Sequence, residues 1–270
     1  MKRWIVAASV ALMAFAAMPA QAADKVVLML NWYVYGEHAP FYYGKAKGIY
    51  AAENIDLEIQ EGRGSAATTQ AVAAKTADFG YVDVPTMMRA AIKGAPVVAT
   101  GVLLQTSPMS AMGFVDKNIR KPEDIKGKTV AITPADSMTQ IWPLFLKKTG
   151  LKESDFQTVA GDGQTKLNAV INGQADLLLG YVMDQSMKIK DATGKDVNAI
   201  KFADYGINMV CSGIVANTDF VKANADLVKR FMSATTKAVE AAEKDAKGAA
   251  QSILDANPKG GKIETLTQGF

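Results

Sequence analysis

Short apolar runs and longer helical patterns alternate along most of the chain. Residues 26–30 form an apolar run that predicts a buried strand, and residues 55–60 alternate apolar and polar side chains, which predicts a strand with one wetter face. Between them, Pro40 to Lys47 has the pattern of a helix, with proline in its first turn and Gly48 as the stop. Strands that alternate with helices in this way are typical of α/β folds with largely parallel sheets.

Two stretches of the sequence repeat the same order of features. Residues 62–83 (GRGSAATTQAVAAKTADFGYVD) and residues 161–184 (GDGQTKLNAVINGQADLLLGYVMD) each open with Gly-x-Gly and continue into an amphipathic helix. Each then has Ala-Asp before an apolar strand that closes on Gly-Tyr-Val. Coincidence among common residues is the alternative, but a duplicated strand–helix–strand unit explains the shared order better.

The duplication predicts two doubly wound α/β lobes joined by two hinge crossings. Residues 23–105 form the first part of lobe 1, residues 106–205 form lobe 2, and residues 206–270 return to lobe 1 and end in C-terminal helices. The crossings are expected near residues 105–108 and 204–207.

In open α/β sheets, ligands bind beyond the carboxyl ends of the strands. If the two lobes face each other, the loops at these strand ends line one cleft. The ligand-binding residues that we expect on this basis are Asn31, Trp32, Tyr35, His38, Gly64, Ser65, Tyr81, Asp83, Ser137, Trp142, Gly161, Asp162, Tyr181 and Asp184.

Aromatic side chains and the single histidine gather just after the first strand. Stacking on a flat ligand explains Trp32 and Tyr35, and the alternative for Trp32 is that it plugs the base of the cleft. His38 either donates to a ligand or caps the helix that begins near residue 40. Tyr181 and Trp142 are candidates for a second stacking ring, although Trp142 is equally placed to pack in a core.

Polar groups in the cleft loops point to two ligand classes. Gly64-Ser65 and Asp136-Ser137 precede helices, whose free N–H groups suit an anion, although ordinary N-capping explains both serines as well. Carboxylates instead accept from N–H groups and repel a sulfonate or nitrate; these are Asp83, which could also cap a helix, Asp162 and Asp184. We predict a flat nitrogen heterocycle, with a small sulfonate or carboxylate as the alternative.

The first residues have the features of a secretory signal peptide. Lys2 and Arg3 precede an apolar run from Trp4 to Met18, and Ala20-Gln21-Ala22 supplies a cleavage site. The predicted signal peptide is residues 1–22, so the mature protein is expected in the periplasm. No later apolar run is long enough to insert into a membrane.

The mature chain is nearly neutral and poor in reactive side chains. The sequence has 30 Lys and Arg against 27 Asp and Glu, and removing Lys2 and Arg3 leaves 28 against 27. A nucleic-acid-binding protein needs a basic stripe, so we exclude that class. Because Cys211 and His38 are the only cysteine and histidine, we predict no disulfide, metal, cofactor or enzymatic activity. We expect a monomer that binds a small molecule.

Several segments resemble one family of binding proteins. They are LNW after the first strand, HAPFYYGKAKGIYAAENIDLEI, AVAAKTADFGY, KPEDIKGKTVAI and ANTDFVKANADLVKRFM. Their order resembles the periplasmic solute-binding proteins of ABC importers, of the type that binds nitrate, sulfonates, taurine and thiamine precursors. The resemblance implies the fold called periplasmic binding protein type II, a cleft that closes on its ligand, and a permease partner. It also suggests a thiamine pyrimidine precursor as the heterocycle.

Eukaryotic enzymes that make the thiamine pyrimidine resemble the same chain at HAPFYYGKAKG and FGYVDVPTMMRAAIKG. By that resemblance they carry a cofactor-binding lysine and a histidine where this sequence has Val82 and Thr86, and a cysteine-rich run where it has Cys211 alone. We therefore expect the synthase activity to be absent. A sensor subunit that binds the solute without transport is a third alternative.

Overall fold

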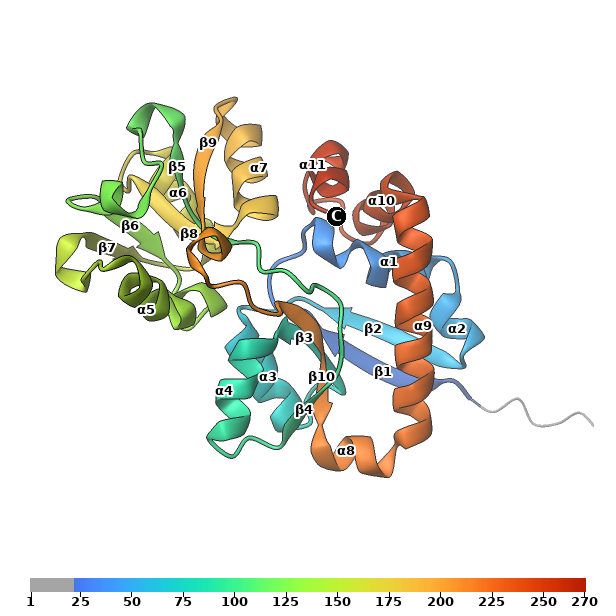
Figure 1. Cartoon of the computed structure of the whole chain (residues 1–270). Helices are drawn as coiled ribbons and strands as arrows, with labels where there is room; N and C mark the ends of the chain where they lie inside the picture. Colours follow the sequence, from blue (N-terminus) through green and yellow to red (C-terminus); the bar gives the residue numbers. More distant parts are fainter. Residues whose placement is uncertain (1–21) are drawn as a thin grey trace, which may run out of the picture.

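Two five-stranded sheets organise the computed structural model, which describes residues 22–270 (Figure 1). The strand order is β2-β1-β3-β10-β4 in the first sheet and β7-β6-β8-β5-β9 in the second. In each sheet the fourth strand runs antiparallel to both neighbours, and the first three strands are parallel to one another. The predicted α/β fold with two lobes is confirmed, and the two sheets share one topology.

Lobe 1 holds the first four strands and the last one. Its strands are β1 (Asp24–Met29), β2 (Ile55–Gln60), β3 (Phe79–Asp83), β4 (Val97–Val102) and β10 (Ser212–Asn217). Its helices are α1 (Ala39–Ala46), α2 (Ile49–Ala52), α3 (Ser65–Ala73), α4 (Val84–Ile92), α8 (Thr218–Ala223), α9 (Ala225–Lys244), α10 (Ala246–Ala256) and α11 (Ile263–Gln268). A 3₁₀ helix, η1 (Gly36–His38), leads from β1 into α1.

Lobe 2 is formed by the middle of the chain. Its strands are β5 (Met109–Phe114), β6 (Thr129–Ile132), β7 (Gln157–Ala160), β8 (Leu177–Tyr181) and β9 (Val197–Lys201). Its helices are α5 (Ser137–Thr149), α6 (Gly163–Ile171) and α7 (Val182–Thr193). Its 3₁₀ helices are η2 (Val115–Lys117), η3 (Pro122–Ile125), η4 (Glu153–Asp155) and η5 (Phe202–Tyr205).

The sequence patterns of the strands follow from which faces of each sheet are covered. β3 and β8 lie at the centre of their sheets, and every residue in each is buried. β2 lies at an edge, where Ile55 and Leu57 are buried but Asp56 and Glu58 are exposed. Continuous apolar runs therefore mark the central strands, and the alternating pattern marks the edge strand.

Helices α4, α5 and α6 each begin at a capping aspartate. The aspartate Oδ1 accepts a hydrogen bond from the backbone N–H three residues later, at 2.8–2.9 Å, in Asp83, Asp136 and Asp162. Such a cap satisfies a free N–H group and places negative charge at the positive end of the helix, and it typically stabilises a protein by about 1 kcal/mol. Helix capping, which the sequence left as an alternative for Asp83, is thus one role that it has.

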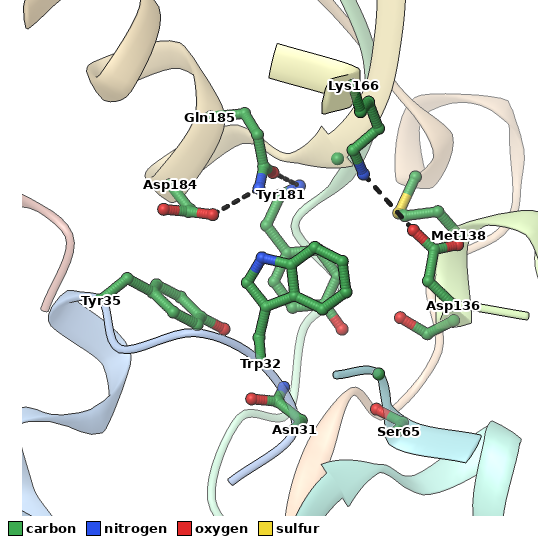
Figure 2. Close-up of a pocket in the computed structure, with 13 residues that line it drawn as sticks. Asn31, Trp32, Tyr35, Ser65, Asp136, Met138, Lys166, Tyr181, Asp184 and Gln185 are labelled. Carbon is green, nitrogen blue, oxygen red and sulfur yellow. Dashed lines mark hydrogen bonds and ion pairs between the residues drawn. The ribbon is translucent and has the colours of Figure 1, made fainter. Parts of the chain in front are cut away.

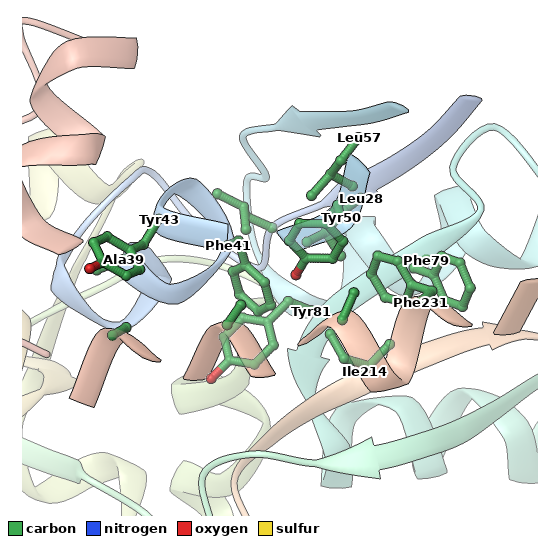
Figure 3. Packing of buried hydrophobic residues seen from close by; sticks show 14 of the residues in the cluster. Leu28, Ala39, Phe41, Tyr43, Tyr50, Leu57, Phe79, Tyr81, Ile214 and Phe231 are labelled. Carbon is green, nitrogen blue, oxygen red and sulfur yellow. The ribbon is translucent and has the colours of Figure 1, made fainter. Parts of the chain in front are cut away.

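Aromatic rings form the centre of the lobe 1 core (Figure 3). Phe79 of β3 stacks on Phe231 of α9 with ring centres 3.9 Å apart, and Phe41 of α1 meets the Tyr81 ring edge-on at 5.1 Å. Burying one such side chain stabilises the fold by about 1.5–3 kcal/mol. These contacts fix α1 and α9 against the sheet, and the carboxyl ends of β1 and β3 are held in place with them.

The lobe 2 core contains a second aromatic stack, which includes a residue that the sequence assigned to the cleft. Trp142 of α5 stacks on Phe145 at 5.1 Å and on Phe202 of η5 at 5.8 Å. Only 6 % of Trp142 is exposed. Because its ring is covered by Phe145 and Phe202, Trp142 packs inside the core of lobe 2.

Two chain crossings connect the lobes, and they run next to each other. Residues 103–108 lead from β4 to β5, and residues 206–211 lead from η5 to β10. Backbone hydrogen bonds join the two crossings, because Leu103 and Leu104 donate to the Ser212 carbonyl and Cys211 donates to the Leu104 carbonyl. The crossings therefore form a paired connection at the base of the cleft.

The N-terminal segment predicted as a signal peptide lies, except for its last residue, outside the described residues. Within residues 22–270, no helix combines the length and the apolar character that a membrane span requires.

Candidate functional site

A small pocket, partly open to solvent, lies where the two lobes meet (Figure 2). Lobe 1 contributes the loop after β1 and the start of α3. Lobe 2 contributes the starts of α5 and α7, the end of β8 and one side chain of α6. The residues that line the pocket are Asn31, Trp32, Tyr35, Gly64, Ser65, Asp136, Ser137, Met138, Lys166, Gly180, Tyr181, Asp184 and Gln185.

Trp32 reaches from lobe 1 across to lobe 2. In Figure 2 its indole lies in the middle of the pocket, with Tyr35 on one side and Met138 and Asp136 on the other. The indole lies so close to the start of α6 that a Cβ atom on Gly163 would be 2.5 Å from Trp32 Cζ2. Glycine at position 163 therefore lets the two lobes approach each other around this ring.

Asn31 lies on the floor of the pocket and is held by His38. The imidazole Nε2 of His38 is 2.8 Å from Asn31 Oδ1, and the Tyr35 N–H donates to His38 Nδ1 over 3.4 Å. No part of His38 is exposed. Burial, reinforced by the Lys188 charge, lowers the pKa of His38 to about 3, so this histidine is neutral at physiological pH.

Lys166 brings a buried positive charge to the lobe 2 wall. Its Nζ lies 3.3 Å from Asp136 Oδ2 and 5.3 Å from the centre of the Trp32 ring. The side chains of Lys166 and Asp136 are only 2 % and 6 % exposed. Because Asp136 also caps α5, one carboxylate fixes both a helix start and the ammonium group that faces the pocket.

Asp184 places a carboxylate at the opposite end of the same wall. Gln185 Oε1 accepts from the Tyr181 N–H at 2.7 Å, and Gln185 Nε2 donates to Asp184 Oδ2. Lys188 Nζ lies 2.8 Å from Asp184 Oδ1, one helical turn along α7. A side chain at Gly180 would meet Gln185 Oε1 at 2.2 Å, so glycine there makes room for the amide that orients Asp184.

A buried hydroxyl and carboxyl cluster lies behind the pocket. The hydroxyl groups of Tyr35 and Tyr81 both donate to the Glu37 carboxylate. Burial raises the pKa of Glu37 above its ordinary value, and the two tyrosine hydrogen bonds partly offset this. Tyr181 of β8 also takes part, because its hydroxyl accepts a hydrogen bond from Cys211 Sγ at 3.2 Å. Burial raises the pKa of the Cys211 thiol, so it stays protonated.

Eight of the fourteen residues expected from the sequence come together in this pocket, and for them ligand contact stays a prediction. They are Asn31, Trp32, Tyr35, Gly64, Ser65, Ser137, Tyr181 and Asp184. They share one origin, because each lies at or just beyond the carboxyl end of a strand, where the two lobes face each other.

The other six lie outside the pocket lining, for identifiable reasons. His38 and Tyr81 belong to the buried layer behind Asn31 and Tyr35. The carboxylates of Asp83 and Asp162 point at helix starts, and Trp142 packs in the lobe 2 core. The sixth residue, Gly161, packs against Thr165, because a Cβ atom at position 161 would lie 2.4 Å from Thr165 Cγ2.

Four residues of the pocket lining were not predicted from the sequence: Met138, Lys166, Gly180 and Gln185. A fifth, Asp136, was predicted only as part of a helix start. One signal was available for Lys166. It lies in the first turns of α6, where a positive charge opposes the positive end of the helix and needs a compensating partner. Within residues 22–270, no group of three or more His, Cys, Asp or Glu side chains is arranged to hold a metal ion.

The sequence matches the family described as NMT1/THI5 like over residues 36–249. The chain belongs to this family. It is 25 % identical over 238 residues to a 4-amino-5-hydroxymethyl-2-methylpyrimidine phosphate synthase of Legionella pneumophila, covering 87 % of this chain and 75 % of that protein. It is also 25 % identical to the riboflavin-binding protein RibY of Chloroflexus aurantiacus, covering 79 % of this chain and 61 % of the relative.

Two solved structures with the same fold are described as solute-binding proteins. The alkanesulfonate-binding protein SsuA of Xanthomonas axonopodis, bound to MOPS, has a TM-score of 0.72 at 15 % identity, covering 92 % of this chain and 83 % of that one. The periplasmic nitrate-binding protein NrtA of Synechocystis has a TM-score of 0.69 at 13 % identity, covering 90 % and 69 %. At these identities the likeness shows the fold. The family resemblance expected from the sequence is thereby confirmed.

The prediction that this chain is not an enzyme is overturned by its curated relatives. The Legionella protein and relatives from Candida albicans and Saccharomyces cerevisiae carry the name of a phosphate synthase, at 23–25 % identity. That prediction rested on missing residue pairs in the sequence, whereas these relatives, matched over most of this chain, are named as enzymes.

Proposed function

We propose that the pocket between the lobes captures a small nitrogen heterocycle. The observation that supports this most directly is the combination of flat rings with one fixed donor and one fixed acceptor. Trp32 and Tyr35 supply rings, the Asn31 amide supplies N–H groups, and Asp184 supplies a carboxylate. Relatives named for a pyrimidine and for riboflavin handle molecules of this chemistry.

The placement of these groups supports a mechanism of capture by closure. Lobe 1 carries Asn31, Trp32 and Tyr35, whereas lobe 2 carries Asp184, so a ligand that touches all of them holds the lobes together. Such a ligand favours the closed form by its differential affinity for that form. The paired crossings at residues 103–108 and 206–211 would serve as the hinges.

A small anion is the second candidate, and the buried Lys166 favours it. The free N–H groups at the starts of α3 and α5, beside Ser65 and Ser137, also suit an anion. The fold neighbours SsuA and NrtA are named for the binding of an alkanesulfonate and of nitrate. Against this, Lys166 is already paired with Asp136, and Asp184 is paired with Lys188, so neither pair leaves a free positive charge for an anion.

Isothermal titration calorimetry of the purified protein distinguishes these candidates. The probes are 4-amino-5-hydroxymethyl-2-methylpyrimidine, its phosphate, riboflavin, MOPS and nitrate. We expect one of the heterocycles to bind and both MOPS and nitrate to fail. Binding of only MOPS or nitrate would overturn the heterocycle in favour of the anion. Mass spectrometry of the released compound reports whether it leaves unchanged, which tests the activity in the relatives' names.

We further propose that the protein is exported and passes its solute to the permease of an ABC importer. The signal-like N-terminus and the fold shared with periplasmic binding proteins support this. The mass of the exported protein should correspond to a chain starting at Ala23. Capture of a permease from membranes by the ligand-bound protein supports import, whereas capture of a receptor alone would indicate a sensor subunit.

A further inference from the structure

We propose that His38 is a positioning residue: it fixes the Asn31 amide with its NH₂ group toward the ligand, so that lobe 1 donates to a hydrogen-bond acceptor on the ligand ring. This inference rests on the proposed function, because it concerns the same pocket, and it narrows the class of heterocycle that the pocket takes.

The hydrogen bonds around His38 determine its tautomer. The Tyr35 backbone N–H can only donate, so His38 Nδ1, which faces it, must accept. In a neutral imidazole the proton then sits on Nε2, which lies 2.8 Å from Asn31 Oδ1. The low pKa of His38 agrees with a ring that keeps one unprotonated nitrogen. His38 is therefore the donor, and the Asn31 oxygen is the acceptor.

The same bond determines which way the Asn31 amide points. Its oxygen is engaged by His38, so its nitrogen must face elsewhere, and in Figure 2 that nitrogen points toward the middle of the pocket. Among residues 22–270, nothing accepts a hydrogen bond from Asn31 Nδ2. The His38 ring cannot easily turn to release the amide, because the Tyr35 and Tyr81 rings meet it edge-on at 4.4 and 5.8 Å.

The lobe 2 wall presents a hydrogen-bond acceptor, whereas the Asn31 amide of lobe 1 presents a donor. Gln185 accepts from the Tyr181 N–H and donates to Asp184 Oδ2, and Lys188 Nζ lies 2.8 Å from Asp184 Oδ1, so the carboxylate accepts from a ligand through the lone pairs that these two donors leave free. The pocket thus offers a donor from lobe 1 and an acceptor from lobe 2. An aromatic ring with a ring nitrogen and an amino group, as in an aminopyrimidine, satisfies both. A sulfonate or nitrate presents acceptors only.

The first test needs no ligand. In ¹⁵N NMR of the protein at pH 7, the His38 signals should show the tautomer protonated at Nε2. A ring protonated at Nδ1 would overturn the inference and leave the proposed function standing. If none of the heterocyclic probes binds the wild type, the proposed function fails, and the tautomer still reports on the positioning of Asn31.

The second test is a double-mutant cycle with 4-amino-5-hydroxymethyl-2-methylpyrimidine as the probe. His38→Leu should weaken binding about tenfold, because the unheld Asn31 amide is free to turn its oxygen inward. His38→Gln should restore most of the affinity, since its NH₂ group replaces Nε2 as the donor. In an Asn31→Ala background, His38→Leu should change affinity less than about twofold.

Additive losses in that cycle would show that His38 acts on the fold in general, and would overturn the inference. If the His38→Leu variant does not fold, two other single variants, Asn31→Asp and His38→Gln, are compared with the wild type in its place. Asp presents only acceptors when ionised, so Asn31→Asp should weaken binding of the aminopyrimidine at least tenfold, and unchanged binding would contradict a donor at this position.

Discussion

The two walls of the pocket come from sheets with the same strand order, yet they carry different chemistry. The lobe 1 wall is aromatic and neutral, with Trp32 and Asn31 in front of the uncharged His38. The lobe 2 wall contains the buried ion pair of Lys166 with Asp136 and the carboxylate of Asp184. The same strand order thus supports an aromatic, neutral wall in lobe 1 and a charged wall in lobe 2. The two lobes differ in the side chains at their strand ends and not in the arrangement of their strands.

The largest effects are expected from substitution of two tryptophans, because Trp32 should act mainly in ligand binding and Trp142 mainly in folding. Trp32→Ala should weaken ligand binding about a hundredfold, as for a buried aromatic hot spot, because it removes the ring in the centre of the pocket. Its effect on the free energy of unfolding should be smaller, since Trp32 is only half-buried.

Trp142→Ala is the matched control, because it removes the same side chain from the lobe 2 core. It should lower the free energy of unfolding by about 3–5 kcal/mol through the cavity left beside Phe145 and Phe202. Calorimetry and urea unfolding of both variants measure the two quantities. A Trp32→Ala variant that loses stability like Trp142→Ala, with unchanged affinity, would make Trp32 a structural plug.

These tryptophans also show how far the sequence leads. The rule that ligands bind beyond strand ends places Trp32 in the pocket, because residue 32 is the third residue after β1. Trp142 lies one turn into α5, where the direction of the side chain depends on what covers the helix. The covering residue is Phe202, which is 60 positions away in the sequence and joins the stack only after the lobe folds.

The residues missed by the sequence share this dependence on distant partners. Lys166 reads as an ordinary surface lysine until Asp136, 30 residues earlier, is placed beside it. Glu37 accepts from the neighbouring Tyr35 hydroxyl, and it gains its second donor only when Tyr81, 44 residues later, is placed beside it. Local patterns therefore predict the strands, helices and strand-end loops, whereas the pairing of buried polar groups follows from the assembled sheets.

Breaking the ion pair tests the charged wall directly. Lys166→Met removes the ammonium group and leaves the Asp136 carboxylate buried without its charged partner. Removing one partner of a buried pair typically costs 3–5 kcal/mol, and because Asp136 keeps its hydrogen bond to the Thr139 N–H, we expect a loss of about 2 kcal/mol in unfolding free energy.

The double variant Lys166→Met with Asp136→Asn should recover much of this loss, since Asn keeps the helix cap and carries no charge. Urea unfolding at neutral pH measures both variants. If the single and double variants are equally destabilised, the loss comes from packing around the lysine stem and not from the stranded carboxylate.

A smaller effect on the free energy of unfolding is expected when a capping aspartate is replaced, because Asp83 in lobe 1 and Asp162 in lobe 2 have different surroundings. Burial raises the pKa of Asp83 in lobe 1 to about 6, and one oxygen of this carboxylate has no hydrogen-bond partner in the described part of the chain. The native state therefore binds more protons than the unfolded state between about pH 4 and 6, so the ionised group lowers stability as pH rises through that range.

Asp83→Asn should raise the free energy of unfolding by about 1 kcal/mol at pH 7.5, and this gain should vanish near pH 4. Removing the charge relieves more than this, but the new NH₂ group is itself buried without a partner, which offsets part of the gain. Asp162→Asn in lobe 2 is the control. The hydrogen bonds from Thr165 lower the pKa of Asp162, so this variant should lose stability at pH 7.5 instead. A stability loss for both variants would place the Asp83 pKa in the ordinary range.

The smallest effect is expected at a surface contact between the lobes. Lys262, just before α11, lies 3.5 Å from Asp191 of α7, and Thr265 also donates to this carboxylate. An exposed pair of this kind contributes about 0–1 kcal/mol, but it exists only while the lobes are together. Asp191→Asn should therefore leave the unfolding free energy nearly unchanged and weaken ligand binding about twofold at low salt.

The pair between Lys190 and Asp196 provides the matched control, because it is exposed and lies wholly within lobe 2. Asp196→Asn removes a surface carboxylate of the same sign without touching the contact between lobes, so ligand affinity should not change. Titrations at low and high salt complete the comparison, since screening should abolish the difference between Asp191→Asn and the wild type. Equal affinity of the Asp191→Asn variant and the wild type at low salt would show that closure depends on the pocket walls alone, and that α11 adds nothing to it.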